Sequence, residues 1–483
     1  MNIKMIKYII GTILKLEASF MLIPLFLSFF YKESNLVKFS HGITIFLSFI
    51  IGFFLSKKTP ENTKIFAKEG LLIVSFSWIT LSLFAALPFF ISRQIPSYID
   101  AFFEVVSGFT TTGASILTNV EALDKSLLFW RSFTHLVGGM GVLVLALAIL
   151  PKNSNQSLHI MKAEVPGPTF GKLVAKMSYN SRILYMIYIF ITLLIIFFLF
   201  IGGMPLFDSV VHAFGTVGTG GFGIKNTSVA YYNNPYIEYV LGIGMLLCGM
   251  NFNLFYALIL KNFKQVMKNE ELRFYLGIVS ISIILICINI SSSYSSFSKL
   301  FRDVFFTVSS IITTTGFATA DFDKWPVFSK TILLLLMFIG GCAGSTAGGL
   351  KVSRIVVLFK TCVNELKKIS TPNRILSIKI DGKPISKDLF NSISTYLILY
   401  IFIFFLILLS VSFETKTFTE AFSAVAATFN NIGPGLEAVG PTGNFSHFSD
   451  FNKIVLSLSM LLGRLEIFPI LILFSPSLYK KFK

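Results

Sequence analysis

The chain has 483 residues, of which 54% are hydrophobic and only 13% are charged. Soluble globular domains are about a quarter charged, so this composition and the mean hydropathy of +0.75 exclude an ordinary soluble protein. The net charge of +17 would suggest a nucleic-acid partner in a soluble chain, but membrane proteins collect Lys and Arg in their cytoplasmic loops. We therefore expect a membrane protein without a nucleic-acid partner.

Ten apolar runs approach the length of about 20 residues that a membrane-spanning helix needs. In chain order they cover residues 8–30, 41–55, 71–91, 127–150, 183–201, 237–260, 274–290, 331–350, 389–412 and 454–474. The first run follows Lys4 and Lys7 and resembles a signal peptide, but it is too long and has no clear cleavage site. We interpret it as a retained span.

The loops between these runs differ in charge. When they are assigned alternately from a cytoplasmic N-terminus, the inner segments carry the whole excess of Lys and Arg, and the outer segments are slightly acidic. This asymmetry follows the positive-inside rule. It predicts a multi-pass protein with both termini in the cytoplasm.

Four outer segments, each between two apolar runs, share one pattern. An acidic residue precedes a glycine by 13 positions in each, with a mostly apolar stretch between them. The pairs are Asp100 and Gly113, Asp208 and Gly221, Asp303 and Gly316, and Glu420 and Gly433. A single such segment could be an outer loop with a turn-forming glycine, but four at one spacing indicate an internal repeat.

Each repeat is expected to be a helix, a re-entrant segment and a second helix. The acidic residue suits the start of a short helix, β-branched Thr favours extended backbone, and Gly allows carbonyl groups to turn toward an axis. Irregular backbone at membrane depth must line a cavity or be buried, so we predict a cation pore lined by carbonyl oxygens. The candidate lining residues are Thr111, Thr112, Gly113, Thr219, Gly220, Gly221, Thr314, Thr315, Gly316, Asn431, Ile432 and Gly433.

These segments resemble the filter sequences of the Trk/Ktr superfamily of potassium transporters. The stretches that carry the resemblance are FTTTGAS (109–115), GTVGTGGFG (215–223), TTTGFATADF (313–322), FNNIGPGL (429–436), GGCAGSTAGGLKVSR (340–354) and GRLEIFP (463–469). The last two, and the extra N-terminal pair of spans, resemble the membrane subunit of bacterial Trk systems. In plant relatives that favour sodium the first filter glycine is often Ser, so Gly113 favours potassium. Gly218 and Gly220 make the second segment the most divergent of the four.

The resemblance implies potassium uptake across a bacterial cytoplasmic membrane through one pore. It also implies a homodimer and a cytosolic nucleotide-binding regulatory subunit. Potassium would be the substrate, and no covalent cofactor is expected. A sodium-permeable or poorly selective pore remains an alternative, because selectivity depends on filter geometry.

The eighth apolar run is rich in glycine. Five glycines within ten residues would each disfavour a helix by about 0.8 to 1 kcal/mol relative to Ala, so we expect an intramembrane loop that obstructs the pore below the filter. Close helix packing through small residues is the alternative. Lys351 and Arg354 follow at once and would couple the loop to the cytosolic face. The candidate gate residues are Gly340, Gly341, Gly344, Ser345, Thr346, Gly348 and Gly349.

Polar residues inside the spans are few. Arg464 and Glu466 are two positions apart and do not face each other on a helix. The resemblance implies that Arg464 projects toward the pore beneath the filter, with a structural ion pair as the alternative. His135 and His212 are interpreted as satisfied core residues, and Asn251 and Asn253 as donors of interhelical hydrogen bonds.

An enzyme is not expected, because the sequence contains no HExxH, GxSxG or GxxxxGKS motif and the spans offer few titratable groups. The four cysteines have no CxxC spacing, which argues against a zinc site or redox chemistry.

The predicted fold is therefore an all-α polytopic membrane protein with four pseudo-symmetric helix, pore-loop and helix repeats around one central pore and two extra N-terminal transmembrane helices. The expected parts are an N-terminal helix pair (1–69), pore repeats 1 (70–150), 2 (183–260), 3 with the gating loop (261–360) and 4 (388–483), and cytoplasmic connections at 151–182 and 361–387. Either connection could bind the regulatory partner or lie against anionic membrane lipid.

Overall fold

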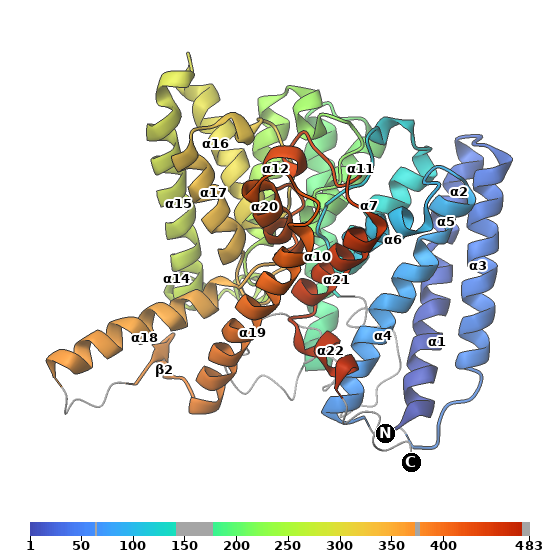
Figure 1. The fold of residues 1–483 in the computed structure, drawn as a ribbon, viewed down its shortest axis with the longest axis horizontal. Coiled ribbons are helices and arrows are strands. Elements are labelled where there is room, and N and C mark those ends of the chain that lie inside the picture. Colours follow the sequence, from blue (N-terminus) through green and yellow to red (C-terminus); the bar gives the residue numbers. More distant parts are fainter. Residues whose placement is uncertain (63–64, 142–176, 372–376, 476–483) are drawn as a thin grey trace.

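The computed structural model describes residues 1–62, 65–141, 177–371 and 377–475. Helices dominate these residues, and one two-stranded antiparallel hairpin pairs β1 (Lys379–Ile380) with β2 (Lys383–Pro384). Long helices stand roughly side by side, and the N-terminus lies at the lower end of the molecule in Figure 1. The predicted all-α class is confirmed for the described part of the chain.

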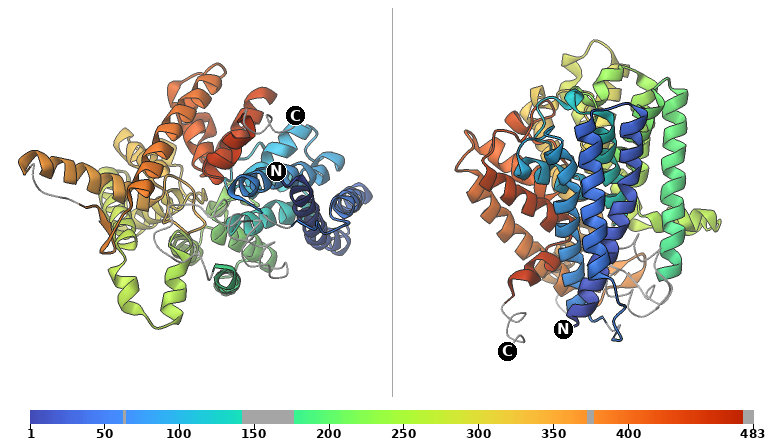
Figure 2. Two further views of the ribbon diagram at one scale, coloured as in Figure 1. Left: turned by 90° about the horizontal axis from the view of Figure 1, so that it is seen from below. Right: turned by 90° about the vertical axis from the view of Figure 1, so that its right-hand side faces the viewer.

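Three N-terminal helices lie at one side of the bundle and make up two candidate spans, since the first two helices together form one of them (Figures 1 and 2). They are α1 (Ile3–Phe20), α2 (Leu22–Phe30) and α3 (Asn35–Leu55). Gly11 and Gly52 allow α1 and α3 to approach closely, since a Cβ on either glycine would lie 2.7 Å from the carbonyl oxygen of the other. The Ser34 side chain accepts a hydrogen bond from the Val37 N–H and so begins α3.

The remaining helices follow in chain order. They are α4 (Ala67–Ala85), α5 (Leu87–Ile91), α6 (Tyr98–Phe109), α7 (Lys125–Gly139), α10 (Met177–Ile201), α11 (Leu206–Val217), α12 (Pro235–Cys248), α13 (Phe252–Ile259), α14 (Phe263–Lys268), α15 (Glu270–Ile290), α16 (Phe297–Ile312), α17 (Val327–Ile339), α18 (Val352–Ser370), α19 (Lys387–Val411), α20 (Phe418–Phe429), α21 (Asp450–Arg464) and α22 (Phe468–Leu471). Within the described ranges, six helices are long and apolar enough to cross a membrane, and α12 with α13 forms a bent seventh candidate.

Several predicted spans are wrong as continuous helices. The run 237–260 bends by 93° between α12 and α13, because Asn251 leaves the helix and its side chain caps α13 by accepting from the Asn253 N–H. The last run breaks after Arg464, where Glu466 and Ile467 adopt positive φ. In the run 127–150, α7 ends at Gly139, and residues 142–150 lie outside the described part.

Four shorter helices, α6, α11, α16 and α20, precede the four glycines of the repeat pattern. Each ends four residues before its glycine. Asp100, Asp208 and Glu420 lie in first turns, as expected, although Ser97 and Thr417 provide the caps of α6 and α20. The expected start at Asp303 is wrong, since α16 begins at Phe297 and Asp303 lies further along the helix.

Candidate ion pathway

All four short helices end in the same hydrogen-bonded motif. After α6, the Thr111 N–H donates to the Gly108 carbonyl oxygen and the Thr112 N–H to that of Ser107, at 3.1 and 2.9 Å. Equivalent bonds run from Gly220 to Gly215, from Thr315 to Ser310 and from Ile432 to Ala427, each 2.8 Å. This Schellman arrangement satisfies carbonyl groups at a helix end and turns the chain sharply.

The Schellman turn overturns one expectation about backbone shape. The residue two positions before each glycine is left-handed, with φ of 54° at Thr111, 55° at Thr219, 54° at Thr314 and 57° at Asn431. The expectation of extended Thr is therefore wrong at these positions. Left-handed backbone is a genuine outlier for a β-branched residue, and such strain, of about 1 to 3 kcal/mol per residue, collects at functional sites.

The four glycines form a closed ring. A Cβ on Gly113 would lie 2.1 Å from the carbonyl oxygen of Gly220, one on Gly221 would lie 1.9 Å from that of Thr315, and one on Gly316 would lie 2.1 Å from that of Ile432. Gly433 closes the circle, because its Cβ would lie 2.7 Å from the Thr112 carbonyl oxygen. Each glycine therefore abuts the carbonyl group just before the next glycine, and no side chain fits.

A hollow of about 100 Å³, here called the outer hollow because the sequence predicts its side to face outward, opens onto this ring. Gly113, Gly221, Gly316 and Gly433 all line it, together with Arg131. In the first segment the Thr110 and Thr112 hydroxyl oxygens are 2.7 Å apart. In the third segment those of Thr313 and Thr315 are 2.8 Å apart. The structure thus brings all four predicted filter segments to one place.

A buried ion pair that the sequence reasoning missed links the first and second segments. Glu104 on α6 accepts from Arg131 Nε at 2.6 Å, from the Ser115 hydroxyl at 2.9 Å and from the Ile116 N–H at 2.9 Å. Arg131 also donates to the Gly223 carbonyl oxygen at 2.9 Å and lies 3.4 Å above the Phe222 ring. The signal was available, since Arg131 is a charged residue inside an expected span.

The glycine-rich segment between α17 and α18 is a loop, so the prediction that it would not be a continuous helix is confirmed. Gly340, Gly344 and Gly349 have φ of 73°, 71° and 76°. The loop contacts the filter segments directly, because the Gly348 N–H donates to the Thr314 hydroxyl at 2.6 Å. Gly348 also lies against the Asn430 carbonyl group, 2.3 Å from where a Cβ would sit.

The bend between α12 and α13 holds the other side of the loop. The Cys342 N–H donates to the Gly249 carbonyl oxygen at 2.9 Å, and the Phe252 N–H donates to that of Gly344 at 3.0 Å. The Thr346 hydroxyl donates to the Cys248 carbonyl oxygen at 3.2 Å. Ser345 turns inward and bonds to Cys342 within the loop. Gly341 lies against the bend as well, with its Cβ position 3.0 Å from the Gly249 carbonyl oxygen.

Glu271, at the start of α15, is a second residue that the sequence reasoning missed. Its carboxylate accepts from the Ala343 N–H at 2.7 Å and from the Ser353 N–H at 3.0 Å, so it joins the glycine-rich loop to the first turn of α18. The side chain is only 8% exposed. An acidic residue directly before an apolar run was the available signal.

Arg464 donates hydrogen bonds to the backbone of two elements, the glycine-rich loop and the end of α7. Its Nη1 donates to the Thr346 carbonyl oxygen at 2.8 Å, and its Nη2 donates to the carbonyl oxygens of Gly138 and Gly139. The guanidinium group thus connects the glycine-rich loop to the end of α7 directly below the filter segments. Glu466 does not pair with Arg464, as expected from their spacing, and instead accepts from Arg354 at 2.6 and 3.1 Å.

Lys351 and Arg354 lie where the loop passes into α18. Lys351 is 2% exposed and donates to the Ala347 carbonyl oxygen inside the loop. Arg354 donates to the Leu350 carbonyl oxygen at 3.1 Å and stacks 4.0 Å above the Tyr396 ring. Both side chains therefore connect the loop to neighbouring elements.

The remaining polar candidates differ in how their side chains are hydrogen-bonded. His212 is buried, bonds through Nδ1 to the Asp208 carbonyl oxygen at 2.8 Å and stacks on Phe317, but its Nε2 has no hydrogen-bond partner among the described residues. The expectation of a satisfied core residue is therefore confirmed only in part for His212. His135 is buried against Phe222, but neither ring nitrogen has a hydrogen-bond partner in the described part of the chain. The expected interhelical bonds of Asn251 and Asn253 are wrong, because the Asn253 Nδ2 donates locally to Asn251 at 3.0 Å.

Comparison with known proteins finds relatives that match the chain over its whole length. A family model for TrkH, described as a cation transport protein, matches residues 37–481. The chain is 35% identical over 488 residues to the Trk system potassium uptake protein TrkH of Escherichia coli (strain K12), with 100% of each chain covered, and 34% identical to TrkG of the same strain, with 98% covered.

A solved structure agrees over almost the whole chain. The structure of the potassium transporter TrkH from Vibrio parahaemolyticus has a TM-score of 0.89 and 32% identity, with 99% of each chain covered. These matches confirm the family resemblance. They also confirm the predictions that the chain is a multi-pass membrane protein and that it is a transporter and not an enzyme. The chain belongs to the TrkH family of cation transport proteins.

Proposed function

We propose that this protein is the pore-forming subunit of a Trk-type potassium uptake system. The observation that carries the proposal is the closed ring of Gly113, Gly221, Gly316 and Gly433, each against a carbonyl group of the next segment. The proposal is also supported by the relatives TrkH and TrkG of Escherichia coli, which are potassium uptake proteins. Backbone carbonyl groups gathered in this way suit the binding of a small dehydrated cation.

The filter of this pore would be the backbone around the ring. Carbonyl oxygens replace the hydration shell of a potassium ion, and those just before the four glycines belong to Thr112, Gly220, Thr315 and Ile432. The C-terminal ends of α6, α11, α16 and α20 lead into the filter, and the negative end of a helix dipole stabilises a nearby cation. The candidate filter residues named from the sequence are the proposed binding set.

The glycine-rich loop would be the gate. It lies between the filter segments and Arg464, and its hydrogen bonds to Thr314, Gly249 and Glu271 hold it in place. Arg464 would repel cations below the filter and fasten Thr346 to α7. Lys351 and Arg354 would transmit motion from the cytosolic side. We expect deletion of residues 344–347 to raise the resting ion flux, and an unchanged flux would remove the gate assignment.

The architecture in this proposal has four pseudo-symmetric repeats around one pore, with boundaries as expected from the sequence and both termini in the cytoplasm. A homodimer and a cytosolic nucleotide-binding regulatory subunit complete the system. Most of the first expected docking segment, 151–182, lies outside the described residues. The second, 361–387, includes the end of α18 and the β1–β2 hairpin.

The decisive experiment is uptake of radioactive rubidium, a potassium surrogate, into proteoliposomes with competition by potassium or sodium. We expect potassium to compete strongly and sodium weakly. Gly113→Ser should lose this discrimination, because its Cβ would lie 2.1 Å from the Gly220 carbonyl oxygen. Gly277→Ser is the matched control, since a Cβ at Gly277 meets nothing within 4 Å. If potassium and sodium competed equally with rubidium in the unmodified protein, the pore would be poorly selective and the potassium assignment would be wrong.

A further inference from the structure

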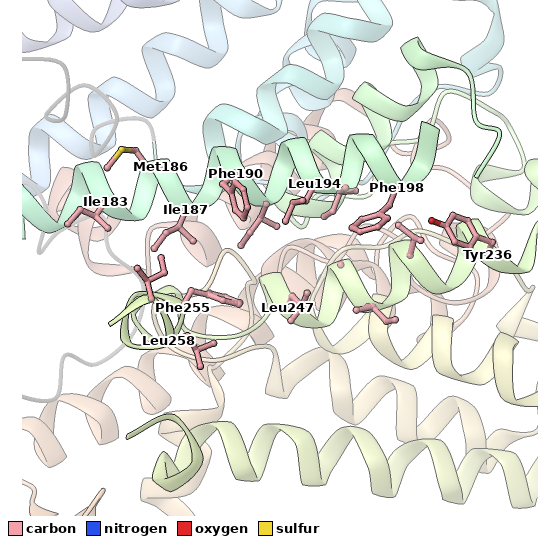
Figure 3. Close-up of a pocket in the computed structure, with 16 residues that line it drawn as sticks. Ile183, Met186, Ile187, Phe190, Leu194, Phe198, Tyr236, Leu247, Phe255 and Leu258 are labelled. Atoms are coloured by element: carbon pink, nitrogen blue, oxygen red, sulfur yellow. The ribbon is translucent and has the colours of Figure 1, made fainter. Parts of the chain in front are cut away.

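A wide apolar groove runs along the outside of the bundle between α10 and the bent pair α12 and α13 (Figure 3). Its volume is about 860 Å³, and its walls are hydrocarbon side chains such as Phe190, Leu194, Leu247 and Leu258. The Tyr236 side chain lies at one end. Neither the filter nor the glycine-rich loop contributes residues to this groove.

The groove lies at membrane depth. Residues 182–201 of α10 qualify as a membrane span, and α12 with α13 qualifies as a broken one. Several lining side chains are open to the surroundings, among them Phe190 at 61% and Ile243 at 51% exposed. A groove open sideways at this depth faces acyl chains and not water.

The length of the groove suits an acyl chain. Its α10 wall extends from Ile183 to Phe198, which is about 22 Å at 1.5 Å per helical residue. One leaflet of the hydrocarbon core is about 15 Å deep, so an extended acyl chain can lie along the wall with its headgroup at the membrane surface.

Basic residues follow the groove at the end of α13. Lys261, Lys264 and Lys268 are exposed, and none of them forms a salt bridge among residues the structure describes. Phe263 and Met267, on the same short helix α14, are 61% and 74% exposed. Exposed apolar and basic side chains together suit the interface of a membrane with anionic headgroups.

We propose that this groove is a binding site for one anionic phospholipid. One acyl chain lies between α10 and the α12–α13 bend, and the phosphate group lies near Lys261 and Lys264. The charge of these lysines favours an anionic lipid over a zwitterionic one. It also favours a lipid over a second copy of this chain, which would bring the same lysines and the same charge.

The lipid would stabilise the bend that holds the glycine-rich loop. The Phe255 ring on the groove wall lies 5.6 Å from the Phe252 ring, and the Phe252 N–H donates to the Gly344 carbonyl oxygen. An empty groove would leave this wall without packing on its outer side. The effect on the gate rests on the function proposed above, whereas lipid binding does not.

Native mass spectrometry of the full chain, purified in mild detergent and supplied with phosphatidylglycerol, tests the binding site. The unmodified protein should retain one more phosphatidylglycerol per chain than Leu194→Trp or Ile243→Trp, whose indole rings fill the groove. Leu193→Trp is the control, because Leu193 is 59% exposed on the same helix but does not line the groove. Equal lipid retention in all four proteins would overturn the proposal, as would dissociation of an oligomer in the two groove variants with no change in bound lipid.

The lysines provide a test that leaves the groove wall intact. The double variant Lys261→Gln and Lys264→Gln should retain less phosphatidylglycerol, and the control pair Lys57→Gln and Lys58→Gln, also exposed, should retain as much as the unmodified protein. Equal losses in both pairs would show unspecific charge attraction and overturn the site.

Resting rubidium flux tests the link to the gate. We expect a several-fold higher flux in vesicles of phosphatidylcholine alone than in vesicles that also contain phosphatidylglycerol, and no such difference for Leu194→Trp, which fills the groove permanently. A flux independent of vesicle composition in the unmodified protein would overturn the link. Failure of the potassium assignment would appear separately, as equal competition by sodium and potassium.

Discussion

At the scale of single residues, the ring depends on the absence of side chains. Gly113, Gly221 and Gly316 all lie so close to a neighbouring carbonyl group that a Cβ would be about 2 Å from its oxygen, whereas the distance at Gly433 is 2.7 Å. Real Cβ atoms essentially never approach other atoms this closely. A methyl group at any of these positions must therefore displace backbone.

These distances predict a ranking of alanine variants. Gly221→Ala, with the shortest distance of 1.9 Å, should lose more discrimination between rubidium and sodium than Gly433→Ala. All four glycines have positive φ, so both variants carry backbone strain and differ mainly in the clash. The ratio of uptake inhibition by potassium and by sodium measures the effect. A greater loss at Gly433 would contradict the ring geometry.

The ion pair of Glu104 and Arg131 makes a second prediction at this scale. Removal of one partner from a buried pair costs about 3 to 5 kcal/mol, so Arg131→Met and Glu104→Gln should each lower thermal stability in detergent. They should also weaken discrimination, because the pair fixes the backbone of the first and second filter segments. Simultaneous replacement of both should cost less than the sum of the two single changes.

A suitable control for this pair lies on the outer surface. Lys225 and Glu121 are 3.1 Å apart but partly exposed, and a hydrogen bond from Lys225 lowers the pKa of the Glu121 carboxyl group. Lys225→Met should leave discrimination nearly unchanged, because exposed ion pairs contribute little. If Lys225→Met reduced discrimination as strongly as Arg131→Met, a general loss of positive charge near the outer hollow would explain the effects of both variants.

At the scale of elements, the glycine-rich loop is held by parts that are distant in sequence. The bend between α12 and α13, the start of α15 and the end of α21 each bond to it. Cys342 and Leu350 pack into the hydrophobic core, and the hydrogen bonds fix the backbone of the loop between them. Such a segment can move without unfolding the helices around it.

Glu271 gives the prediction at this scale. Hydrogen bonds to a charged group contribute about 1.5 to 3 kcal/mol each, and the Glu271 carboxylate accepts two from the loop region. Glu271→Leu should therefore release the loop and raise the resting rubidium flux into proteoliposomes. Glu270→Leu is the control, since Glu270 pairs with Lys360 outside the loop. This anchoring role would be contradicted if the resting flux rose in Glu270→Leu or did not rise in Glu271→Leu.

At the scale of the whole molecule, the helices give the protein two distinct ends. Helix α18 lies at the same end as the N-terminus in Figure 1. This end is basic in sequence, so we assign it to the cytoplasm. The four glycines that follow the short helices line the outer hollow.

Cysteine labelling tests this orientation. Cys362 on α18 is exposed, whereas Cys248 and Cys342 are buried. A membrane-impermeant maleimide should label Cys362 in inside-out vesicles and leave it unmodified in intact cells. Lys324→Cys, at a position where the side chain is 83% exposed, should show the reverse pattern in a Cys362→Ser background. Labelling of Cys362 from outside would invert the assigned topology.

Much of this organisation could be predicted from the chain alone. Apolar runs located the spans because a bilayer demands about 20 apolar residues per helix. The spacing of 13 residues between an acidic residue and a glycine located all four segments that meet in the glycine ring. The five glycines between residues 340 and 349 predicted a non-helical loop because of their intrinsic cost in a helix.

Tertiary structure decided what local pattern could not. The left-handed backbone of Thr111, Thr219 and Thr314 opposes the preference of Thr, and the hydrogen bonds of a helix end impose it. The ion-pair partner of Glu104 lies 27 residues away in sequence, and the partners of Glu271 and Arg464 lie at least 72 and 118 residues away, so no periodicity reveals them. Sequence alone determined which segments enter the membrane, because hydrophobicity is a property of each segment; packing determined which carbonyl groups and charges meet, because that depends on how distant segments are placed together.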